Sequence, residues 1–309
     1  MKSAESMIQE LLPSWQKKPE KFFLDALDVK QEHVWDKMTE VMESVRDHKL
    51  TAVKAAHGVS KTYTAARLVL WFLYCHGPKA PVITTAPTHQ QVEAVLWREI
   101  RAAHAGARLP LGGNLTKTKL ELAEKWFAIG FATRPDTVTE QATNFQGLHN
   151  DNVLIIFEEA AGIPKEIWEA ADSLMQGGSI IRFLAIGNPT SAGGNFVECF
   201  KSSLYRQITI SVFDTPNYKQ NANVIPGLSG RDFVEFVEQK YGKDSAYYKS
   251  RVLAQIPDED ADALLPHAEI EKATNRMVQK WNYEKRFVVW DVADGGDDAH
   301  QIYGFANTD

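Results

Sequence analysis

Apolar and polar positions follow two patterns along this chain: continuous apolar runs, which predict strands, and apolar residues at helical spacing, which predict helices. Nearly continuous apolar runs, typical of buried strands, lie near 51–55 and at 82–88, 153–157 and 179–186. Apolar residues at helical spacing predict helices over 63–73 and from about 89 to 105. Because apolar strands alternate with helices, the pattern predicts an α/β fold with a parallel sheet covered by helices on both faces.

Two segments depart from this alternation. Residues 117–122 and 126–132 alternate between polar and apolar side chains, which predicts a β-hairpin. Residues 1–50 carry apolar side chains at mixed helical spacings and predict a helical segment packed on the core. Pro13 and Pro19 are expected to break its first part, because proline interrupts the hydrogen bonds of a helix interior.

The composition restricts the class of protein. With 309 residues, 44% of them hydrophobic and 24% charged, the chain is long enough for about two globular domains. A net charge of −6 excludes a protein that binds nucleic acid through its overall charge. Any contact with DNA therefore requires a local basic surface, or is weak and transient.

No segment predicts a membrane span or a signal peptide. The longest apolar run, Leu68–Cys75, is far too short to cross a bilayer, and residues 1–10 lack the basic and apolar regions of a secretory signal. The two cysteines, Cys75 and Cys199, form neither a disulfide framework nor a metal-ligand pattern, which indicates a reducing compartment.

The segment from Thr51 to Thr62 carries the first pattern with chemical meaning. A short strand leads into small residues, and Lys61 and Thr62 then begin an apolar helix. This order is typical of a phosphate-binding loop, in which backbone N–H groups face the phosphates, the lysine neutralises charge and the hydroxyl holds Mg²⁺. The candidate nucleotide-binding residues are Ala55, His57, Gly58, Val59, Ser60, Lys61 and Thr62.

The same segment departs from the full pattern of such a loop. Glycine is expected at the positions of Ala55 and Ser60, whereas Gly58 lies between them. The alternative interpretation is an ordinary strand-to-helix turn with an exposed lysine.

Two carboxylates follow the apolar run 153–157. Glu158 and Glu159 stand at the carboxyl end of a predicted strand, where an open α/β sheet binds its ligands. A phosphate-loop enzyme needs one carboxylate there to organise hydrated Mg²⁺ and a second to polarise the attacking water. Glu158 suits the first role, although aspartate is more usual there, and Glu159 suits the second. The alternative is a solvated strand end.

Two amide side chains are further candidates. The run 179–186 continues into Gly187, Asn188 and Pro189, and helicases and related motors sense the γ-phosphate with a polar residue at this strand end. The alternative for Asn188 is a simple Asn-Pro turn. Gln31 lies upstream of the phosphate loop, where some ATPases place a glutamine that recognises adenine, and the alternative is a solvated helix residue.

Taken together, these strand ends and their order resemble the large terminase subunit of tailed bacteriophages, the motor that packages DNA into procapsids. Members of that family often carry Gln-Gly-x-His just before the acidic strand, and residues 145–149 have the sequence Phe-Gln-Gly-Leu-His. The resemblance extends from about residue 27 to the end. Further family-like segments lie at 160–168, 215–217, 225–228, 241–242 and 248–253.

The resemblance implies a definite organisation of the chain. A helical N-terminal segment (1–50) precedes a P-loop NTPase core (51–212) with a mainly parallel central sheet. A linker or lid subdomain (213–285) and the first strand of an RNase H-like nuclease domain (286–309) follow.

The implied activity is that of an ATP-hydrolysing motor that drives viral DNA into procapsids. Lys61 is expected to contact the β- and γ-phosphates of ATP, while Thr62 and Glu158 hold Mg²⁺. Glu159 is expected to position the attacking water, and Asn188 to couple hydrolysis to movement.

In this family an arginine of the neighbouring subunit completes the ATP site in a ring. Arg134 is the candidate for that role, and Arg98 and Arg101 are weaker ones. The isolated chain is expected to be a monomer. Because such an arginine lowers the activation barrier of ATP hydrolysis substantially, this monomer is expected to be a poor ATPase. The assembled form is expected to be a homo-oligomeric ring.

The resemblance also implies a nuclease metal ligand near the end of the sequence. Asp291 occupies the place of an aspartate that binds one of two catalytic metals, Mg²⁺ or Mn²⁺. The remaining acids of such a site come from later strands, and this sequence ends at Asp309, so no DNA cleavage is expected from the chain alone. The alternative for the acidic cluster 291–298 is a solvated turn or a calcium-like loop.

The implied partners are double-stranded DNA, the portal protein of the procapsid and the small terminase subunit. We expect no membrane partner and a location in the host cytoplasm. Two alternative functions stay open: a catalytically weak nucleotide-binding or docking component, and a helicase-like P-loop ATPase without a role in packaging.

The departures at Ser60 and Glu158 bear on the first alternative, since they either slow hydrolysis or are tolerated variation. A serine before the lysine is expected to fit the loop if its φ stays negative, although its side chain crowds the phosphates.

Overall fold

The computed structural model describes residues 4–133, 150–257, 287–291 and 301–305. The chain divides into two units, Met1–Ala263 and Leu264–Asp309. Arg134 and the motif at 145–149 lie outside the described residues.

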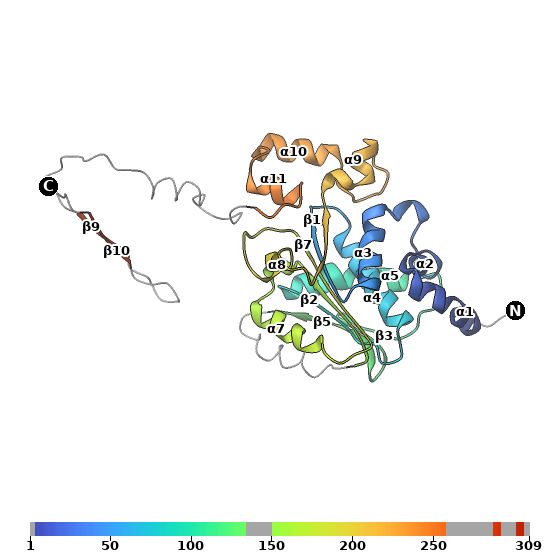
Figure 1. Ribbon diagram of the computed structural model, residues 1–309. Coiled ribbons are helices and arrows are strands. Elements are labelled where there is room, and N and C mark those ends of the chain that lie inside the picture. Colours follow the sequence, from blue (N-terminus) through green and yellow to red (C-terminus); the bar gives the residue numbers. More distant parts are fainter. Residues whose placement is uncertain (1–3, 134–149, 258–286, 292–300, 306–309) are drawn as a thin grey trace. The chain divides into compact units, whose positions relative to one another are not determined.

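Within the described residues, an eight-stranded sheet forms the centre of the first unit (Figure 1). Its strands are β1 (Leu50–Ala55), β2 (Val82–Ala86), β3 (Asn114–Leu115), β4 (Lys119–Ala123), β5 (Trp126–Ala132), β6 (Asn152–Glu158), β7 (Ile180–Gly187) and β8 (Arg206–Ile210). Their order is β3-β4-β5-β2-β6-β7-β1-β8. The strands from β5 to β8 in this order pair in parallel, whereas β3 and β4 are antiparallel. The predicted mainly parallel sheet is confirmed, and β4 and β5 form the predicted hairpin.

The pairing register brings three strand ends to one edge of the sheet. In the pairing of β6 with β7, Glu158 lies opposite Ile186. In the pairing of β1 with β7, Lys54 lies opposite Gly187. The carboxyl ends of β1, β7 and β6 are therefore level, and ligands of open parallel sheets bind at such an edge.

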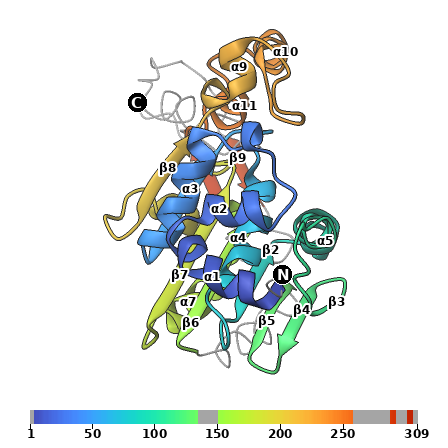
Figure 2. The ribbon, with the colours of Figure 1, turned by 90° about the vertical axis from the view of Figure 1, so that its right-hand side faces the viewer.

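Helices cover both faces of the sheet, as predicted (Figures 1 and 2). On one face lie α1 (Ala4–Lys17), α2 (Pro19–Asp25), α3 (Asp36–Asp47), α4 (Lys61–Cys75), the π-helical segment η2 (Gln91–Leu96) and α5 (Trp97–Ala105). On the other face lie α7 (Lys165–Leu174) and α8 (Asn195–Glu198). The helix α4 is apolar along most of its length because it is buried between the sheet and the N-terminal helices.

The N-terminal helices pack on the core, which confirms that prediction. Phe22 and Phe23 are fully buried, and the indole of Trp71 in α4 donates a hydrogen bond of 2.8 Å to the carbonyl of Trp15. A short 3₁₀ turn, η1 (Gln31–His33), then leads into α3.

The prediction that Pro13 breaks the first helix is wrong, because α1 continues through it. Apolar residues before it (Ile8, Leu11 and Leu12) and Trp15 after it pack on the same core, and this burial outweighs the one missing backbone hydrogen bond. Pro19 instead occupies the first turn of α2, where a proline lacks no bond that the helix would otherwise make.

A helical group follows β8 at the carboxyl edge of the sheet (Figure 1). It consists of η5 (Val212–Asp214), α9 (Pro216–Gln220), α10 (Arg231–Tyr241) and α11 (Ala246–Arg251), and we call it the lid. The buried amide of Asn217 donates to the carbonyls of Ile225 and Leu228, each at 2.9 Å. These bonds hold the loop between α9 and α10 in a defined path.

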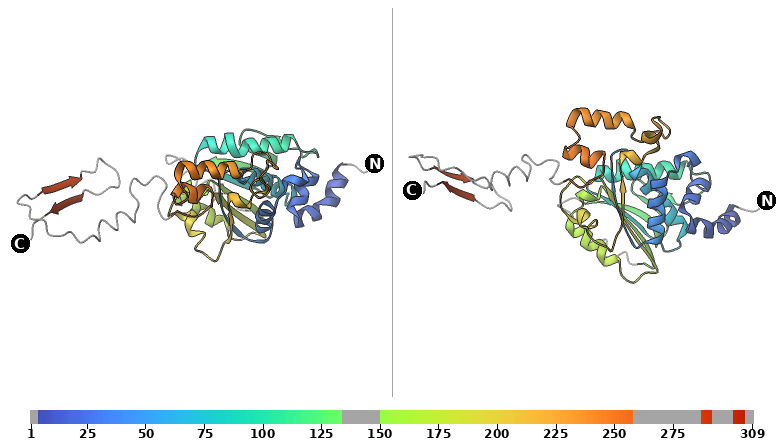
Figure 3. Two further views of the ribbon diagram at one scale, coloured as in Figure 1. Left: turned by 90° about the horizontal axis from the view of Figure 1, so that it is seen from above. Right: turned by 45° about the horizontal axis from the view of Figure 1, so that its top comes forward.

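The described part of the second unit is an antiparallel strand pair (Figure 3). It contains β9 (Phe287–Asp291) and β10 (Gln301–Phe305), with Asp291 opposite Gln301. No helix of the described part of the chain has the length and apolar character needed to cross a membrane.

The burial of the N-terminal helices leads to a stability prediction. Phe22→Ala should lower the free energy of unfolding by about 3–5 kcal/mol, because it opens a cavity in the core. Phe236→Ala, at a side chain that is 56% exposed, serves as the control and should change it by less than about 0.5 kcal/mol. Denaturant unfolding followed by circular dichroism measures both values, and equal losses would contradict the packing described here.

Candidate functional site

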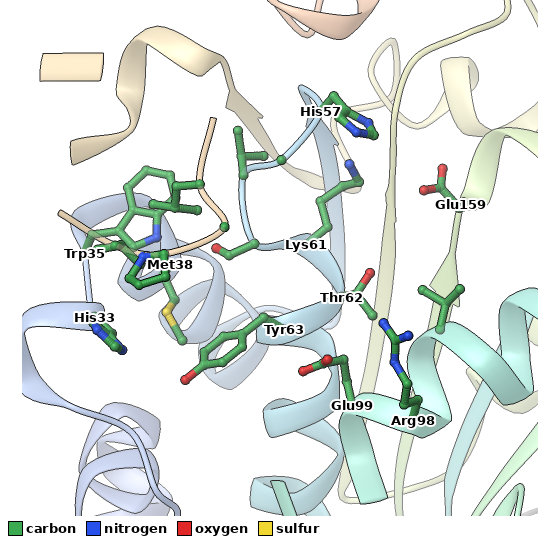
Figure 4. Close-up of a pocket in the computed structure, with 18 residues that line it drawn as sticks. His33, Trp35, Met38, His57, Lys61, Thr62, Tyr63, Arg98, Glu99 and Glu159 are labelled. Atoms are coloured by element: carbon green, nitrogen blue, oxygen red, sulfur yellow. The ribbon is translucent and has the colours of Figure 1, made fainter. Parts of the chain in front are cut away.

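A cavity of about 480 Å³ opens at the carboxyl edge of the sheet (Figure 4). Its walls come from the N-terminal helical segment, the loop after β1, helix α5, the turn after β6 and the lid. The lining residues are His33, Trp35, Met38, His57, Gly58, Val59, Ser60, Lys61, Thr62, Tyr63, Val95, Arg98, Glu99, Glu159, Ile225, Pro226, Gly227 and Leu228. All candidate residues of the phosphate loop except Ala55 line this cavity.

The loop between β1 and α4 presents backbone amides to the cavity. Gly58 and Ser60 have positive φ values of 65° and 62°, and Val59 lies between them. In the described part of the chain, the amides of these three residues donate to no other backbone or side-chain group. Unpaired amides at the N-terminus of a helix are a favourable site for a phosphate.

The start of the loop is tied to neighbouring elements. The amide of Ala56 donates to the carbonyl of Ile210 in β8 at 2.7 Å, and the amide of His57 donates to the carbonyl of Arg251 at 2.9 Å. The lid residue Ser229 donates from its amide to the Gly58 carbonyl. A Cβ at Gly58 would lie 2.2 Å from the hydroxyl oxygen of Ser229, so the positive φ and this close approach both favour glycine there.

Lys61, the first residue of α4, lies beside the loop. Its ammonium group donates to the carbonyl of Ala56 at 2.9 Å and to Oδ1 of Asn188 at 3.2 Å. Burial lowers the pKa of Lys61, and the carboxylates of Glu159 and Glu158 oppose this effect. Figure 4 shows Lys61 and Glu159 on facing sides of the cavity.

The next residue joins the loop to the acidic strand. The hydroxyl of Thr62 donates to Oε1 of Glu158, whose side chain is 1% exposed. The second oxygen of Glu158 is buried and has no hydrogen-bond partner among the described residues. Burial raises the pKa of Glu158 to about 7. A buried carboxylate that has an unpaired oxygen and lies next to a hydroxyl calls for a cation, and these oxygen donors suit Mg²⁺.

The described residues hold no cluster of three or more histidine, cysteine, aspartate or glutamate side chains that could bind a metal. Mg²⁺ usually takes only one or two protein oxygens and completes its shell with water and phosphate oxygens. The Thr62 and Glu158 pair therefore fits Mg²⁺ bound together with a phosphate ligand.

Glu159 occupies a strained turn directly after β6. Its φ of 49° and ψ of 47° are left-handed, a conformation that non-glycine residues adopt seldom and at a cost of about 1–3 kcal/mol. The end of β7 approaches this turn closely, because a Cβ on Gly187 would lie only 2.9 Å from the amide nitrogen of Ala160. The turn directs Glu159 to the cavity, while Glu158 stays buried at the strand end.

Asn188 follows β7 and lies at the centre of a hydrogen-bond network. Its side chain is 1% exposed, and its Nδ2 donates to the carbonyl of Ala55 at 2.6 Å. Its Oδ1 accepts from Lys61 and, at 3.0 Å, from Arg251 in the lid. The predicted residues from all three strand ends are thus brought together.

A phage protein shares sequence with this chain. No family model matches the sequence. A protein of Enterobacteria phage P7 named "Probable terminase, large subunit" is 26% identical over 259 residues, which cover 78% of this chain and 49% of that protein. The chain therefore spans about half the length of this curated relative.

Solved structures of phage large terminases share the fold. The large terminase ATPase domain of Thermus phage P74-26 matches with a TM-score of 0.54 and 14% identity, over 78% of this chain and 99% of that one. The large terminase of another thermophilic bacteriophage, in complex with ADP, matches with a TM-score of 0.53 and 13% identity, over 89% and 66%. A further structure of that second protein holds ATP-γ-S. This chain has the fold of a phage large terminase ATPase domain. The resemblance inferred from the motifs is confirmed.

Several predicted residues lie away from the cavity. Gln31 is exposed and does not line it, whereas His33 of the same 3₁₀ turn does. Arg98 lines the cavity, but Arg101 donates to the carbonyls of Lys117 and Glu93 instead.

Two other predicted residues cannot be placed at the cavity. Arg134 lies outside the described residues, and the backbone of Asp291 ends β9 in the second unit. The predicted roles of both therefore stay predictions.

Sequence reasoning missed the contribution of the lid. The loop residues 225–228 line the cavity, and Ser229 and Arg251 hydrogen-bond to the phosphate loop. The only signal was that residues 225–228 and 248–253 are family-like segments, which assigned them no role at the site.

The condition under which a serine fits this loop without strain, a negative φ, is not met, because the φ of Ser60 is 62° and its ψ is 25°. The carbonyl of Ser60 accepts from both the amide and the hydroxyl of Thr64, so the first turn of α4 holds this peptide in place. Left-handed backbone costs about 1–2 kcal/mol for a residue with a Cβ atom. Ser60 thus stores strain at the position where the usual loop has glycine.

This strain predicts that Ser60→Gly raises the free energy of unfolding by about 1 kcal/mol relative to a matched substitution. Ser203→Gly is the match, because Ser203 is exposed and has no positive φ. Chemical unfolding without nucleotide measures both variants. Identical effects of the two substitutions would show that Ser60 carries no strain.

Proposed function

We propose that this chain binds ATP with Mg²⁺, hydrolyses the ATP, and forms the ATPase part of a phage DNA-packaging motor. The observation that carries the proposal is the hydrogen bond between Thr62 and Glu158, whose second oxygen has no partner in the described part of the chain. The two residues are 96 positions apart in the sequence, and their contact joins the phosphate loop to the acidic strand. An ordinary turn with an exposed lysine does not account for this arrangement.

The chain's own groups suit the phosphates of ATP. The amides of Gly58, Val59 and Ser60 are free to donate hydrogen bonds to phosphate oxygens, and Lys61 is placed to neutralise the charge of the β- and γ-phosphates. Thr62 and Glu158 would hold Mg²⁺, which supplies positive charge to the transferring phosphoryl group.

Glu159 and Asn188 are proposed to act at the γ-phosphate. Glu159 faces the cavity opposite Lys61, where its carboxylate would orient the attacking water and accept its proton. Asn188 accepts a hydrogen bond from Lys61, and through this contact it would respond to the presence or loss of the γ-phosphate.

The remaining wall of the cavity suits a nucleobase. His33, Trp35, Met38 and Tyr63 present aromatic and apolar surface beside the phosphate loop (Figure 4). We assign the adenine base to this wall, with Gln31 as a neighbouring residue that could contact its edge.

The wider role rests on similarity to phage terminases. One of the similar large terminases has been solved with ADP and with ATP-γ-S, and the P7 relative carries the name of a terminase large subunit. We therefore propose double-stranded DNA, the portal protein of the procapsid and the small terminase subunit as partners, and the host cytoplasm as the location. Arg134 is proposed to act in trans in a ring of subunits. Asp291 is proposed as a ligand of Mg²⁺ or Mn²⁺ in a nuclease site.

One observation favours the alternative of a weak nucleotide-binding component. Ser60 is strained in the segment that would contact phosphates, and a hydroxymethyl group there takes space that glycine leaves open. Phosphate release measured with double-stranded DNA and procapsids separates the two functions. Full turnover supports the motor, and tight binding without turnover supports the weak component.

The binding proposal predicts that Lys61→Ala weakens binding of MgATP-γ-S by roughly tenfold or more, because a charge-assisted bond to phosphate is lost. Isothermal titration measures the affinity. Lys201→Ala is the control, since Lys201 is exposed and pairs with Glu198 on the surface, and it should bind like the wild type. Equal affinity of wild type and Lys61→Ala would refute the phosphate-loop assignment.

The catalytic proposal predicts that Glu159→Gln lowers kcat for ATP hydrolysis by about two to four orders of magnitude, because the amide cannot accept the proton of the water. The affinity for MgATP-γ-S should stay within about threefold, since glutamine has the same shape. Glu166→Gln, at an exposed residue of α7, should leave both quantities unchanged. Normal turnover by Glu159→Gln would remove Glu159 from the mechanism.

A further inference from the structure

Arg251, the last residue of α11, contacts the phosphate site with both its main chain and its side chain. Its carbonyl accepts from the amide of His57 in the phosphate loop at 2.9 Å. Its guanidinium donates from Nη1 to Oδ1 of Asn188 at 3.0 Å. One lid residue thus holds the phosphate loop and the end of β7 at the same time.

The geometry of Asn188 makes the guanidinium contact informative. The side-chain amide nitrogen of Asn188 donates to the carbonyl of Ala55, and this bond fixes the direction in which the side-chain oxygen points. In the structure that oxygen accepts from both Lys61 and Arg251. When Lys61 turns to a phosphate, Arg251 is the donor that keeps the buried carboxamide in place.

We propose that Arg251 is a positioning residue that acts within its own chain. Its hydrogen bond fixes the orientation of Asn188 relative to the lid, and thereby the end of the site where the γ-phosphate would bind. The inference rests on the proposed ATPase function and adds a cis-acting arginine to it. The arginine is suited to this task because it stays charged at any physiological pH and its planar group has fixed donor directions.

A purely mechanical role for Arg251 predicts a different result. The lid also supplies residues 225–228 to the cavity wall, so a displaced lid would weaken nucleotide binding and raise KM. A misplaced Asn188 would instead lower kcat while the phosphate loop and the base wall still bind nucleotide. The separation of kcat from KM therefore distinguishes positioning from simple attachment of the lid.

The test measures steady-state ATP hydrolysis and MgATP-γ-S affinity for wild type, Arg251→Ala, Arg251→Lys and Arg251→Gln. We expect Arg251→Ala to lower kcat roughly tenfold to hundredfold, as for the loss of a charged hydrogen bond, with KM and affinity within about threefold. Arg251→Lys retains a charged donor and should recover part of the loss. Lys243→Ala is the control, because Lys243 is an exposed lid cation paired with Glu238 at 3.1 Å.

A double-mutant comparison completes the test. If Arg251 acts through Asn188, adding Arg251→Ala to Asn188→Ala should lower kcat no further. Circular dichroism confirms that each variant is folded, and Arg251→Lys and Arg251→Gln carry the test if Arg251→Ala does not fold.

The outcomes separate this inference from the function on which it rests. A wild type that neither binds nor hydrolyses ATP overturns the proposed function. If the wild type is active, three results overturn the inference about Arg251 alone. These are an unchanged kcat of Arg251→Ala, a change of Arg251→Ala in KM only, and a double mutant with a lower kcat than Asn188→Ala.

Discussion

The contact between the Thr62 hydroxyl and the Glu158 carboxylate is the interaction on which the geometry of the site depends. Thr62 lies in the first turn of α4, which follows β1, whereas Glu158 ends β6, and β7 lies between β1 and β6 in the sheet. The end of β7 must therefore leave room for the turn after β6, and Gly187 does so because it has no side chain to meet the backbone of Ala160. The extra methylene of glutamate lengthens its reach across β7. Glu158 in place of aspartate is thus compatible with the contact that a metal-binding pair requires.

Much of this edge could be predicted because buried parallel strands have a recognisable pattern in the sequence, a continuous apolar run. Runs such as 153–157 and 179–186 are apolar on both faces, so they indicate buried strands, and the polar residues after them fall at one edge. The lid could not be predicted in the same way. Ser229 donates to the carbonyl of His57 across 172 positions, and no local periodicity encodes such a contact. Arg251 reaches Asn188 by the same kind of long-range packing.

At two positions, tertiary contacts override the conformational preference of a single residue. Pro13 stays inside α1 because its neighbours are anchored in the core. Ser60 takes a left-handed conformation that its own side chain disfavours. In each case the sequence shows the cost of the conformation and not the contacts that outweigh it.

Two of the five non-glycine residues with positive φ in the described part of the chain, Ser60 and Glu159, line the same cavity, and this bears on how the departures from the usual loop are interpreted. Ser60 and Glu159 both have positive φ, at a cost of about 1–3 kcal/mol each. Such backbone persists only where surrounding contacts determine it, and here the bonds of Thr64 and the close approach of Gly187 do so. The strain lies in the backbone that orients amides and a carboxylate toward the cavity. A serine at position 60 therefore keeps the shape that glycine would adopt without strain, which favours a working phosphate loop of reduced stability over a loop that has lost its form.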